Sequence, residues 1–273
     1  MIDIVIPVYD GYDETRKCIE SVLKVENKIK YNIIIINDKS PNDKLSKYLK
    51  SLKDQRITLL ENEQNLGFVK TVNKGMKLSN NDVILLNSDT IVTDRWIDKM
   101  YRASKVKENV ATVTALTNNG AIVSVPNFNK DNLLPEGYSI DEFSSLIEKI
   151  SKKKYPEIPT AVGHAMYINR KAIKKVGYFD DKNFGKGYGE ENDFSMRCIK
   201  KGMINIVADD TYIFHFGATS FSANKKNHIE NNKRILYKLH PSLRLRILWF
   251  IYSKNNIKQI CNEIKKKINK NKQ

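Results

Sequence analysis

Asp89 stands at a position in this sequence where chemistry is expected. The apolar run 83–86, Val-Ile-Leu-Leu, leads directly into Asn87, Ser88, Asp89 and Thr90. A short continuous apolar run fits a strand of a parallel sheet that is covered on both faces. Open α/β sheets bind ligands at the carboxyl ends of such strands, so Asp89 is predicted to face a ligand. The alternative is that these polar residues only cap a helix expected over 94–102.

Further acidic groups and one histidine occupy comparable positions. Asp38 follows the apolar run 33–36, and His215 ends a predicted strand. Glu190, Glu191 and Asp193 follow a glycine-rich stretch over 185–189. Each has a structural alternative: Asp38 can form a turn before Ser40 and Pro41, Asp193 can cap a helix over 194–200, and His215 can be a core histidine.

The first half of the chain alternates strands and helices with short connections. We predict strands over 2–9, 31–37, 57–60 and 83–86, and helices over 13–24, 44–53, 69–78 and 94–102. This order predicts a parallel sheet with helices on both faces. No GxGxxG follows the first strand, so a dinucleotide-binding version of the architecture is not supported.

The second half is less regular. We predict strands over 110–116, 121–125, 161–168, 204–208 and 211–214, and helices over 138–151 and 195–200. We therefore expect a main domain over 1–240, with halves 1–110 and 111–240, and a separate tail over 241–273.

The tail carries a large share of the positive charge. The net charge of the 273 residues is +16, and residues 241–273 contribute nine Lys or Arg against one Glu. Apolar residues recur at helical spacing between these lysines: Leu243, Ile247, Phe250, Ile257, Ile260, Ile264 and Ile268. This basic amphipathic pattern fits an anionic membrane surface. Docking on the body or on a partner, or a frayed end, are the alternatives.

Composition excludes several other classes. The three cysteines are far apart and form no CxxC pair, so a disulfide framework or zinc cluster is not expected and a reducing compartment fits. No signal peptide is evident, and no apolar run approaches the ~20 residues of a membrane-spanning helix.

Six motifs in order carry a family resemblance: PVYDG, IIINDKS, NLGFVKTVNKG, LLNSDT, GYGEENDFSMR and HFG. Over about residues 2–221 the chain resembles the inverting glycosyltransferases of family 2. The resemblance implies an α/β fold of the GT-A type, a Rossmann-like, mostly parallel central sheet flanked by helices. To this fold the sequence adds a C-terminal basic amphipathic helical tail.

The resemblance also implies a metal-assisted reaction on a nucleotide-sugar donor. Asp89, in the family's DxD-type element, and His215 would bind Mn²⁺ or Mg²⁺, which stabilises charge on the leaving diphosphate. Here Asn87 replaces the first acid of that element, and it would contact ribose or metal-bound water together with Ser88. Asp38 would hold the uracil or thymine ring.

Other residues take roles by the same resemblance. Pro7, Val8 and Tyr9 would line the base, and Lys70 could pair with the diphosphate. Glu191 would be the general base that takes a proton from the acceptor hydroxyl. Asp193 and Glu190 are the fallback candidates for that role.

These residues lead to one main hypothesis and one alternative. The main hypothesis is a transferase that moves a sugar from a UDP- or dTDP-sugar to a glycan, lipid-linked or protein-linked acceptor in surface polysaccharide or glycoconjugate synthesis. The alternative is a non-catalytic binder of anionic polymer through the tail. We expect a cytoplasmic location, with peripheral attachment at the inner face of the cell membrane as an option through the tail, and no nucleic acid partner.

Overall fold

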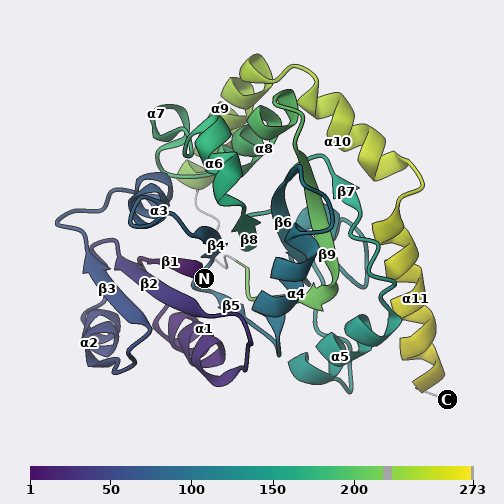
Figure 1. Cartoon of the computed structure of the whole chain (residues 1–273), viewed down its shortest axis with the longest axis horizontal. Coiled ribbons are helices and arrows are strands. Elements are labelled where there is room, and N and C mark those ends of the chain that lie inside the picture. Colours follow the sequence, from purple (N-terminus) through teal and green to yellow (C-terminus); the bar gives the residue numbers. More distant parts are fainter. Residues whose placement is uncertain (218–222, 272–273) are drawn as a thin grey trace.

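The computed structural model describes residues 1–217 and 223–271, and its centre is a mixed sheet (Figure 1). The strands are β1 (Ile2–Val8), β2 (Tyr31–Asn37), β3 (Ile57–Glu61), β4 (Asp82–Leu86), β5 (Thr90–Ile91), β6 (Val110–Leu116), β7 (Glu157–Ile158), β8 (Ala165–Ile168), β9 (Ile204–Tyr212) and β10 (Phe214–His215). The helices are α1 (Tyr12–Lys24), α2 (Asp43–Ser51), α3 (Phe68–Met76), α4 (Trp96–Ser104), the 3-10 helix η1 (Ala121–Val123), α5 (Ile140–Ile150), α6 (Arg170–Val176), α7 (Asp181–Phe184), α8 (Glu190–Lys200), α9 (Ala223–Leu239), α10 (Leu243–Tyr252) and α11 (Asn256–Asn271).

The main sheet has eight strands in the order β3-β2-β1-β4-β8-β6-β9-β7. The first four are parallel, as the strand–helix alternation predicts. β8 lies antiparallel between β4 and β6, and β6 pairs with β9 in parallel. A second, two-stranded sheet pairs β10 with β5. The carboxyl ends of β1, β2, β4 and β6 therefore share one edge with the amino end of β8.

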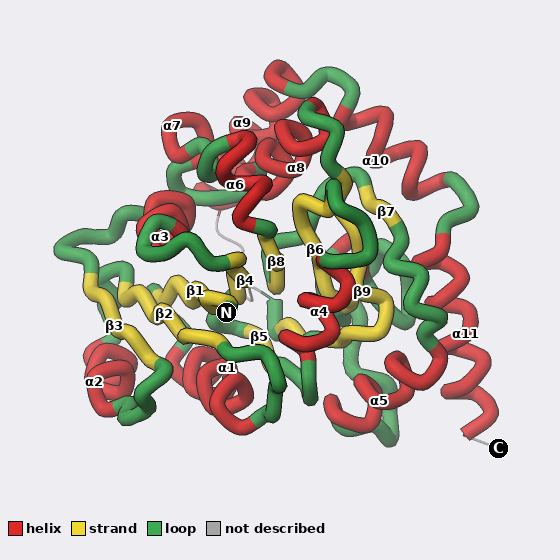
Figure 2. Tube along the Cα trace, viewed as in Figure 1, coloured by secondary structure: helices red, strands yellow, loops and turns green. Residues whose placement is uncertain are grey.

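Helices cover both faces of the sheet because successive side chains of a strand point to opposite faces. In β4, Ile84 and Leu86 pack with α1, α2 and α4, whereas Val83 and Leu85 pack with α3, α6 and α8. Figure 2 shows this strand layer between the two groups of helices. Burial on both sides explains why the strands are continuously apolar rather than alternating.

Gly75 lets α3 approach the sheet closely. A Cβ atom at this position would lie 2.5 Å from Cγ1 of Val5 on β1. That distance is far inside van der Waals contact, so a larger residue would push α3 away from β1. The neighbouring Asn73 binds the backbone of Phe179 in both directions. Both residues of the NLGFVKTVNKG motif therefore serve packing.

Three sequence-based assignments in the second half were wrong. Residues 121–125 form the 3-10 helix η1 and a following bend instead of a strand. The two strands expected over 204–208 and 211–214 are replaced by one continuous strand, β9, and the short β10. The strand expected over 161–168 begins only at Ala165. In each case the apolar run is buried, and burial alone does not fix the backbone conformation.

The tail is helical, as its spacing predicts, and its inner side is docked on the body. Ile257, Cys261 and Ile264 of α11 are buried with α5 and β9, and Leu243 and Phe250 of α10 are buried too. Docking on the body, one of the three interpretations that the sequence left open, therefore describes this stripe. Among the described residues, no helix combines the length and apolarity needed to cross a bilayer.

The three cysteines are free, buried and on three different helices. Cys18 lies on α1, Cys198 on α8 and Cys261 on α11. Burial raises the pKa of each thiol to about 12. The thiols are therefore protonated at neutral pH and pack as small apolar side chains.

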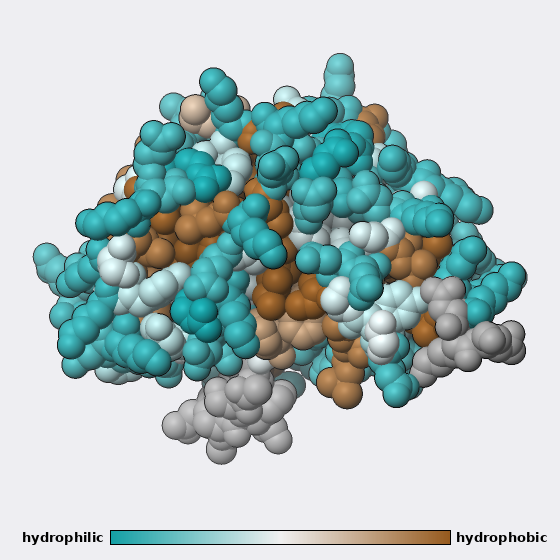
Figure 3. Space-filling model, turned by 90° about the horizontal axis from the view of Figure 1, so that it is seen from below, coloured by the Kyte–Doolittle hydropathy of each residue, from teal (hydrophilic) through white to brown (hydrophobic). Residues whose placement is uncertain are grey.

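The surface is mainly hydrophilic on the side seen in Figure 3, where hydrophobic side chains show mostly in the gaps between hydrophilic ones. A cavity of about 430 Å³ lies between α11 and the segment after α5, and its lining includes Lys152, Lys154, Asp209 and Lys265. None of the predicted site residues lines this cavity.

Candidate active site

Asp89 and His215 meet at the edge of the sheet where the parallel strands end. Asp89 follows β4, and His215 reaches it because β10 pairs with β5, with His215 opposite Thr90. The Nε2 atom of His215 lies 3.2 Å from Oδ1 of Asp89. The amide of Phe216 also donates to the carbonyl of Asp89. Two residues that are 126 positions apart are thus held together by backbone pairing.

The hydrogen bond of His215 to Asn119 determines the tautomer of the neutral imidazole ring. Nδ1 lies 2.7 Å from the carbonyl oxygen of Asn119, which can only accept, so Nδ1 carries the hydrogen. In the neutral ring Nε2 then presents a lone pair to the carboxylate. Either a proton or a cation must lie between these two acceptors. Burial is the largest single effect and opposes the charged ring, but the hydrogen bond and the charge of Asp89, together with the Asn119 carbonyl, raise the pKa of His215.

Asp89 and His215 have the chemistry and spacing of two ligands of one metal ion. In an octahedral site with ligand distances of about 2.0–2.1 Å, adjacent ligand atoms lie about 3 Å apart, close to the separation of Nε2 and Oδ1. The Asn119 carbonyl orients the imidazole as an outer ligand usually does. Within residues 1–217 and 223–271, no group of three or more His, Cys, Asp or Glu side chains could hold a metal ion. These two residues fit a divalent cation that takes further ligands from a substrate or water.

His164 packs against the same histidine. Its ring stacks on that of His215 with centroids 5.8 Å apart and planes 27° apart. Both ring nitrogens are buried and have no hydrogen-bond partner in the described part of the chain. Burial, then the neighbouring His215, lowers the pKa of His164 well below its ordinary value. His164 is therefore a neutral ring packed against the face of His215.

Asp38, which directly follows β2, holds the loop between β3 and α3. It is buried, and Oδ1 accepts hydrogen bonds from Asn62 Nδ2 and the Leu66 amide while Oδ2 accepts one from the Gly67 amide. Gly67 has φ of +81°, and a Cβ there would lie 2.8 Å from the carbonyl oxygen of Gly185. The loop that Asp38 holds thus contacts the glycine-rich stretch before α8.

The remaining predicted donor residues differ in exposure. Tyr9 is exposed just past β1, whereas the side chain of Val8 is buried in the core and Pro7 is half-buried. Lys70 is exposed on the first turn of α3. Asn87 and Ser88 are half-buried beside Asp89, and the Asn87 amide donates to the carbonyl of His164. Val8 can therefore contribute through its backbone but not through its side chain.

Glu190 and Glu191 begin α8 and have different environments. Glu190 is buried and its Oε2 has no hydrogen-bond partner among the described residues. Burial and the charge of Glu191 raise the pKa of Glu190 well above its ordinary value. Glu191 is partly exposed and accepts hydrogen bonds from Asn192 Nδ2 and the Gly189 amide. Burial also raises the pKa of Glu191.

A short series of hydrogen bonds and one ring contact connects the start of α8 to the Asp89–His215 pair. Ser195 Oγ donates to the carbonyl of Glu191, and the amide of Ala161 donates to Ser195 Oγ at 3.0 Å. Ala161 lies three residues before His164, which stacks on His215. Glu191 and Asp89 are therefore both connected to the segment before β8, Glu191 through Ser195 and Asp89 through His215.

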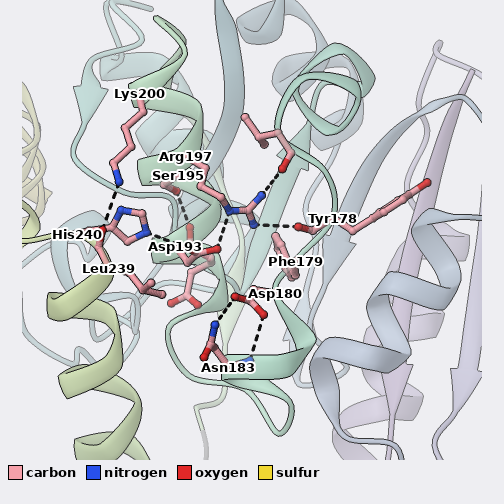
Figure 4. Close-up of polar contacts among 12 residues, drawn as sticks. Tyr178, Phe179, Asp180, Asn183, Asp193, Ser195, Arg197, Lys200, Leu239 and His240 are labelled. Atoms are coloured by element: carbon pink, nitrogen blue, oxygen red, sulfur yellow. Dashed lines mark hydrogen bonds and ion pairs between the residues drawn. The ribbon is translucent and has the colours of Figure 1, made fainter.

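Asp193 has a structural position, inside α8 and not at its cap (Figure 4). Its Oδ2 accepts a 2.7 Å hydrogen bond from Nε of Arg197, and its Oδ1 lies 2.7 Å from Nε2 of His240. Arg197 also donates to the carbonyls of Val176 and Tyr178. Asp193 and His240 are both buried. This carboxylate ties α8 to the end of α9, and both of its oxygens are occupied.

Replacing Asp193 by Ala is expected to destabilise the fold. Arg197 and His240 would lose their shared carboxylate inside the protein, which costs about 3–5 kcal/mol. For a chain of this size that loss lowers the melting temperature by about 10 °C. Thermal unfolding followed by circular dichroism measures it. Glu230→Ala, which removes the exposed ion pair with Lys233, is the control and should change the melting temperature little; equal shifts would contradict this account.

The sequence did not single out every residue of this edge. Asn62 and Asn118 are buried amides that hold Asp38 and the backbone of His215, respectively. His240, which binds Asp193, lies outside every motif named above. An asparagine in a loop carries no distinctive pattern, so only the motif neighbours of these residues could have pointed to them.

Comparison with known proteins identifies a family for most of the chain. The family model described as glycosyl transferase family 2 matches residues 3–177. An uncharacterized glycosyltransferase of Methanocaldococcus jannaschii is 23% identical over 97% of this chain and 83% of its own length. A poly-beta-1,6-N-acetyl-D-glucosamine synthase of Staphylococcus epidermidis is 28% identical over 66% of this chain, which spans 42% of that protein.

Solved structures share the architecture at low identity. GalNAc-T7, solved with UDP, GalNAc and Mn²⁺, has a TM-score of 0.60 and 19% identity over 98% of this chain and 55% of its own. The mannosyltransferase PcManGT of Pyrobaculum calidifontis, solved with GDP-Man and Mn²⁺, has a TM-score of 0.62 and 12% identity over 96% of this chain and 73% of its own. The family match extends over most of the chain, and the chain therefore belongs to glycosyl transferase family 2 and is a glycosyltransferase of the GT-A fold.

Proposed function

We propose that this chain is an inverting, metal-dependent glycosyltransferase. It moves a sugar from a UDP- or dTDP-sugar to a hydroxyl of a glycan, lipid-linked or protein-linked acceptor. The observation that carries the proposal is the Asp89–His215 pair, a carboxylate oxygen and an imidazole nitrogen 3.2 Å apart at the ligand-binding edge of the sheet. Membership of an enzyme family speaks against the alternative of a non-catalytic binder.

Asp89 and His215 would hold Mn²⁺ or Mg²⁺. When bound, the cation acts as a Lewis acid on the diphosphate, whose negative charge grows as the glycosidic bond breaks. Oxygen and imidazole ligands suit both cations, and the imidazole favours Mn²⁺. GalNAc-T7 and PcManGT were both solved with Mn²⁺, which supports the choice. Lys70, exposed at the start of α3, would add positive charge beside the diphosphate.

Asp38, Tyr9 and the backbone of Val8 would receive the nucleoside. Among the described residues, Asp38 Oδ2 accepts a hydrogen bond only from the Gly67 amide, so it keeps a lone pair for the imide N–H of uracil or thymine. Asn87 and Ser88, half-buried next to Asp89, would contact the ribose. GalNAc-T7 was solved with UDP, which is consistent with a pyrimidine donor.

Glu191 would take the proton from the acceptor hydroxyl as that oxygen attacks the anomeric carbon. A single displacement of this kind inverts the configuration and needs one base. Glu191 is the partly exposed member of the pair, whereas Glu190 is enclosed and its pKa is raised well above the ordinary value. The raised pKa of Glu191 makes it a stronger base than an ordinary glutamate.

The name of the staphylococcal relative supports a polysaccharide product. The free cysteines suit a cytoplasmic location.

Donor binding is the most direct test of this proposal. We expect UDP or dTDP, and one of their sugars, to raise the melting temperature in the presence of Mn²⁺ and much less without it, because a ligand stabilises the folded state that binds it. Thermal scanning against UDP-, dTDP-, GDP- and CMP-sugars, with Mn²⁺ or EDTA, gives the answer. A metal-independent shift, or a shift with GDP- or CMP-sugars alone, would contradict it.

A further inference from the structure

Helix α10 is apolar on two sides, and only one of them is covered. Leu243 and Phe250 are buried against the body, and Ile247 is partly buried beside them. The opposite side is exposed; its large side chains are Leu245 (70% exposed), Leu248 (38%), Trp249 (73%) and Tyr252 (80%). Figure 1 shows α10 at the outer edge of the molecule. A helix with apolar side chains on two opposite sides is normally covered on both, so the outer side lacks its cover.

The exposed side chains form one continuous row, which we call the outer row of α10. Leu245, Leu248, Trp249 and Tyr252 are separated by three, four and seven positions from the first. Residues at these separations lie on one face of a helix, and seven residues span about 10 Å. Isolated exposed apolar residues are ordinary on a protein surface, but four large ones in a row mark an interaction site.

Positive charge surrounds the outer row. Arg244, Arg246 and Lys254 are exposed, and none of them has an ion pair within the described ranges. No acidic residue occurs between residues 241 and 262. Farther along, α11 exposes Lys265, Lys267 and Lys270 while its apolar side is docked on the body. The partner of this surface must therefore accept apolar side chains and carry negative charge.

We propose that the outer row of α10 inserts into the interface of an anionic lipid bilayer. Trp and Tyr are enriched at the level of the lipid headgroups, with leucine beneath them, and each basic residue near an anionic surface adds to the attraction. A second copy of this chain would bring another net charge of +16, so charge repulsion opposes self-association through this face. The inference does not depend on the proposed transferase activity.

The chain contains its own reporter for this contact. Of its two tryptophans, Trp96 is fully buried in the core and Trp249 is in the outer row. Transfer of Trp249 from water to a bilayer shifts its fluorescence to shorter wavelength. We expect this shift, with co-sedimentation, when the full chain meets vesicles containing phosphatidylglycerol. Pure phosphatidylcholine vesicles should bind it much more weakly, and added salt should weaken binding to the anionic vesicles.

A paired variant separates insertion from general charge attraction. Leu245→Ser with Tyr252→Ser keeps every charge and the reporter, and should lower the partition coefficient on phosphatidylglycerol vesicles about tenfold or more. The matched control is Leu78→Ser with Val106→Ser, which removes two exposed apolar side chains elsewhere and should bind like the unmodified chain. Circular dichroism verifies that both variants are folded.

Three results would overturn the proposal. The first is no vesicle binding by the unmodified chain, and the second is binding without a shift in Trp249 fluorescence. The third is equal binding by the outer-row variant and the unmodified chain. A dimer in solution that the same variant abolishes would identify a second copy as the occupant instead.

Discussion

Replacing Glu191 by Gln should lower the rate of sugar transfer by about a thousandfold while donor binding persists. Gln retains the size of the side chain but cannot accept the acceptor's proton, and a positioned general base typically contributes 10²- to 10⁴-fold. Glu191→Asp should retain partial activity because the carboxylate remains but reaches less far. Steady-state kinetics and the thermal shift with donor and Mn²⁺ separate the two effects.

Glu190→Gln is the matched control, since it changes the neighbouring acid. Glu190 is enclosed and its pKa is raised well above the ordinary value, so the uncharged amide should preserve most of the activity. The pH profile adds a second measurement. A base with a raised pKa loses its function as the pH falls through that pKa, so the rate should fall at a higher pH than an ordinary glutamate would allow. A large loss in Glu190→Gln with an active Glu191→Gln would reverse the assignment.

Replacing Asp89 by Ala should remove metal binding and lower transfer by about a thousandfold, because the cation contributes several kcal/mol to the transition state. Mn²⁺ binding in the presence of UDP, followed by electron paramagnetic resonance, measures the loss without relying on activity. His215→Ala should weaken Mn²⁺ binding in the same assay. Asp94→Ala, which removes an exposed carboxylate five residues away, is the control and should bind Mn²⁺ normally.

The pH dependence of Mn²⁺ binding tests the same pair. The raised pKa of His215 means that a proton occupies Nε2 up to a higher pH than in a free histidine. The cation must displace this proton, so the apparent affinity for Mn²⁺ should fall as the pH decreases through that pKa. Normal Mn²⁺ binding by Asp89→Ala, or affinity independent of pH, would place the metal elsewhere.

The parallel half of the sheet could be predicted because its strands are buried on both faces. Runs such as 33–36 and 83–86 are continuously apolar, which is typical of such strands, and each ends in a polar turn. This is also why the sequence alone predicts that Asp38 and Asp89 lie at one edge of the sheet. The pairing of β10 with β5, which brings His215 to Asp89, was not predicted. The role of His215 beside Asp89 came from the family resemblance and not from the local pattern.

Side-chain partners across the fold could not be predicted in the same way. Asp193 lies in an acidic cluster, and nothing local indicates that His240, 47 residues later, occupies one of its oxygens. The difference between Glu190 and Glu191 depends on which side of α8 faces the core, which the glycine-rich start of the helix conceals. Register and burial at a helix terminus are set by tertiary contacts that no sequence period records.

The tail shows that helical periodicity identifies the apolar face of a helix but not the surface that this face contacts. Leu243, Phe250 and Ile257 follow the expected stripe, yet they contact the body. Helix α10 has a second apolar side, and because its residues are apolar nearly all round, the periodicity could not separate the inner side from the outer one.

The three buried cysteines make this chain convenient for site-directed chemistry. A thiol with a pKa of about 12 has almost no thiolate at neutral pH, and thiolate is the form that reacts with maleimides and iodoacetamides. A cysteine introduced at an exposed position, such as Lys70→Cys, would therefore react selectively. Spin labels, fluorophores or crosslinkers can be attached there while Cys18, Cys198 and Cys261 remain in place, with no need for a cysteine-free background.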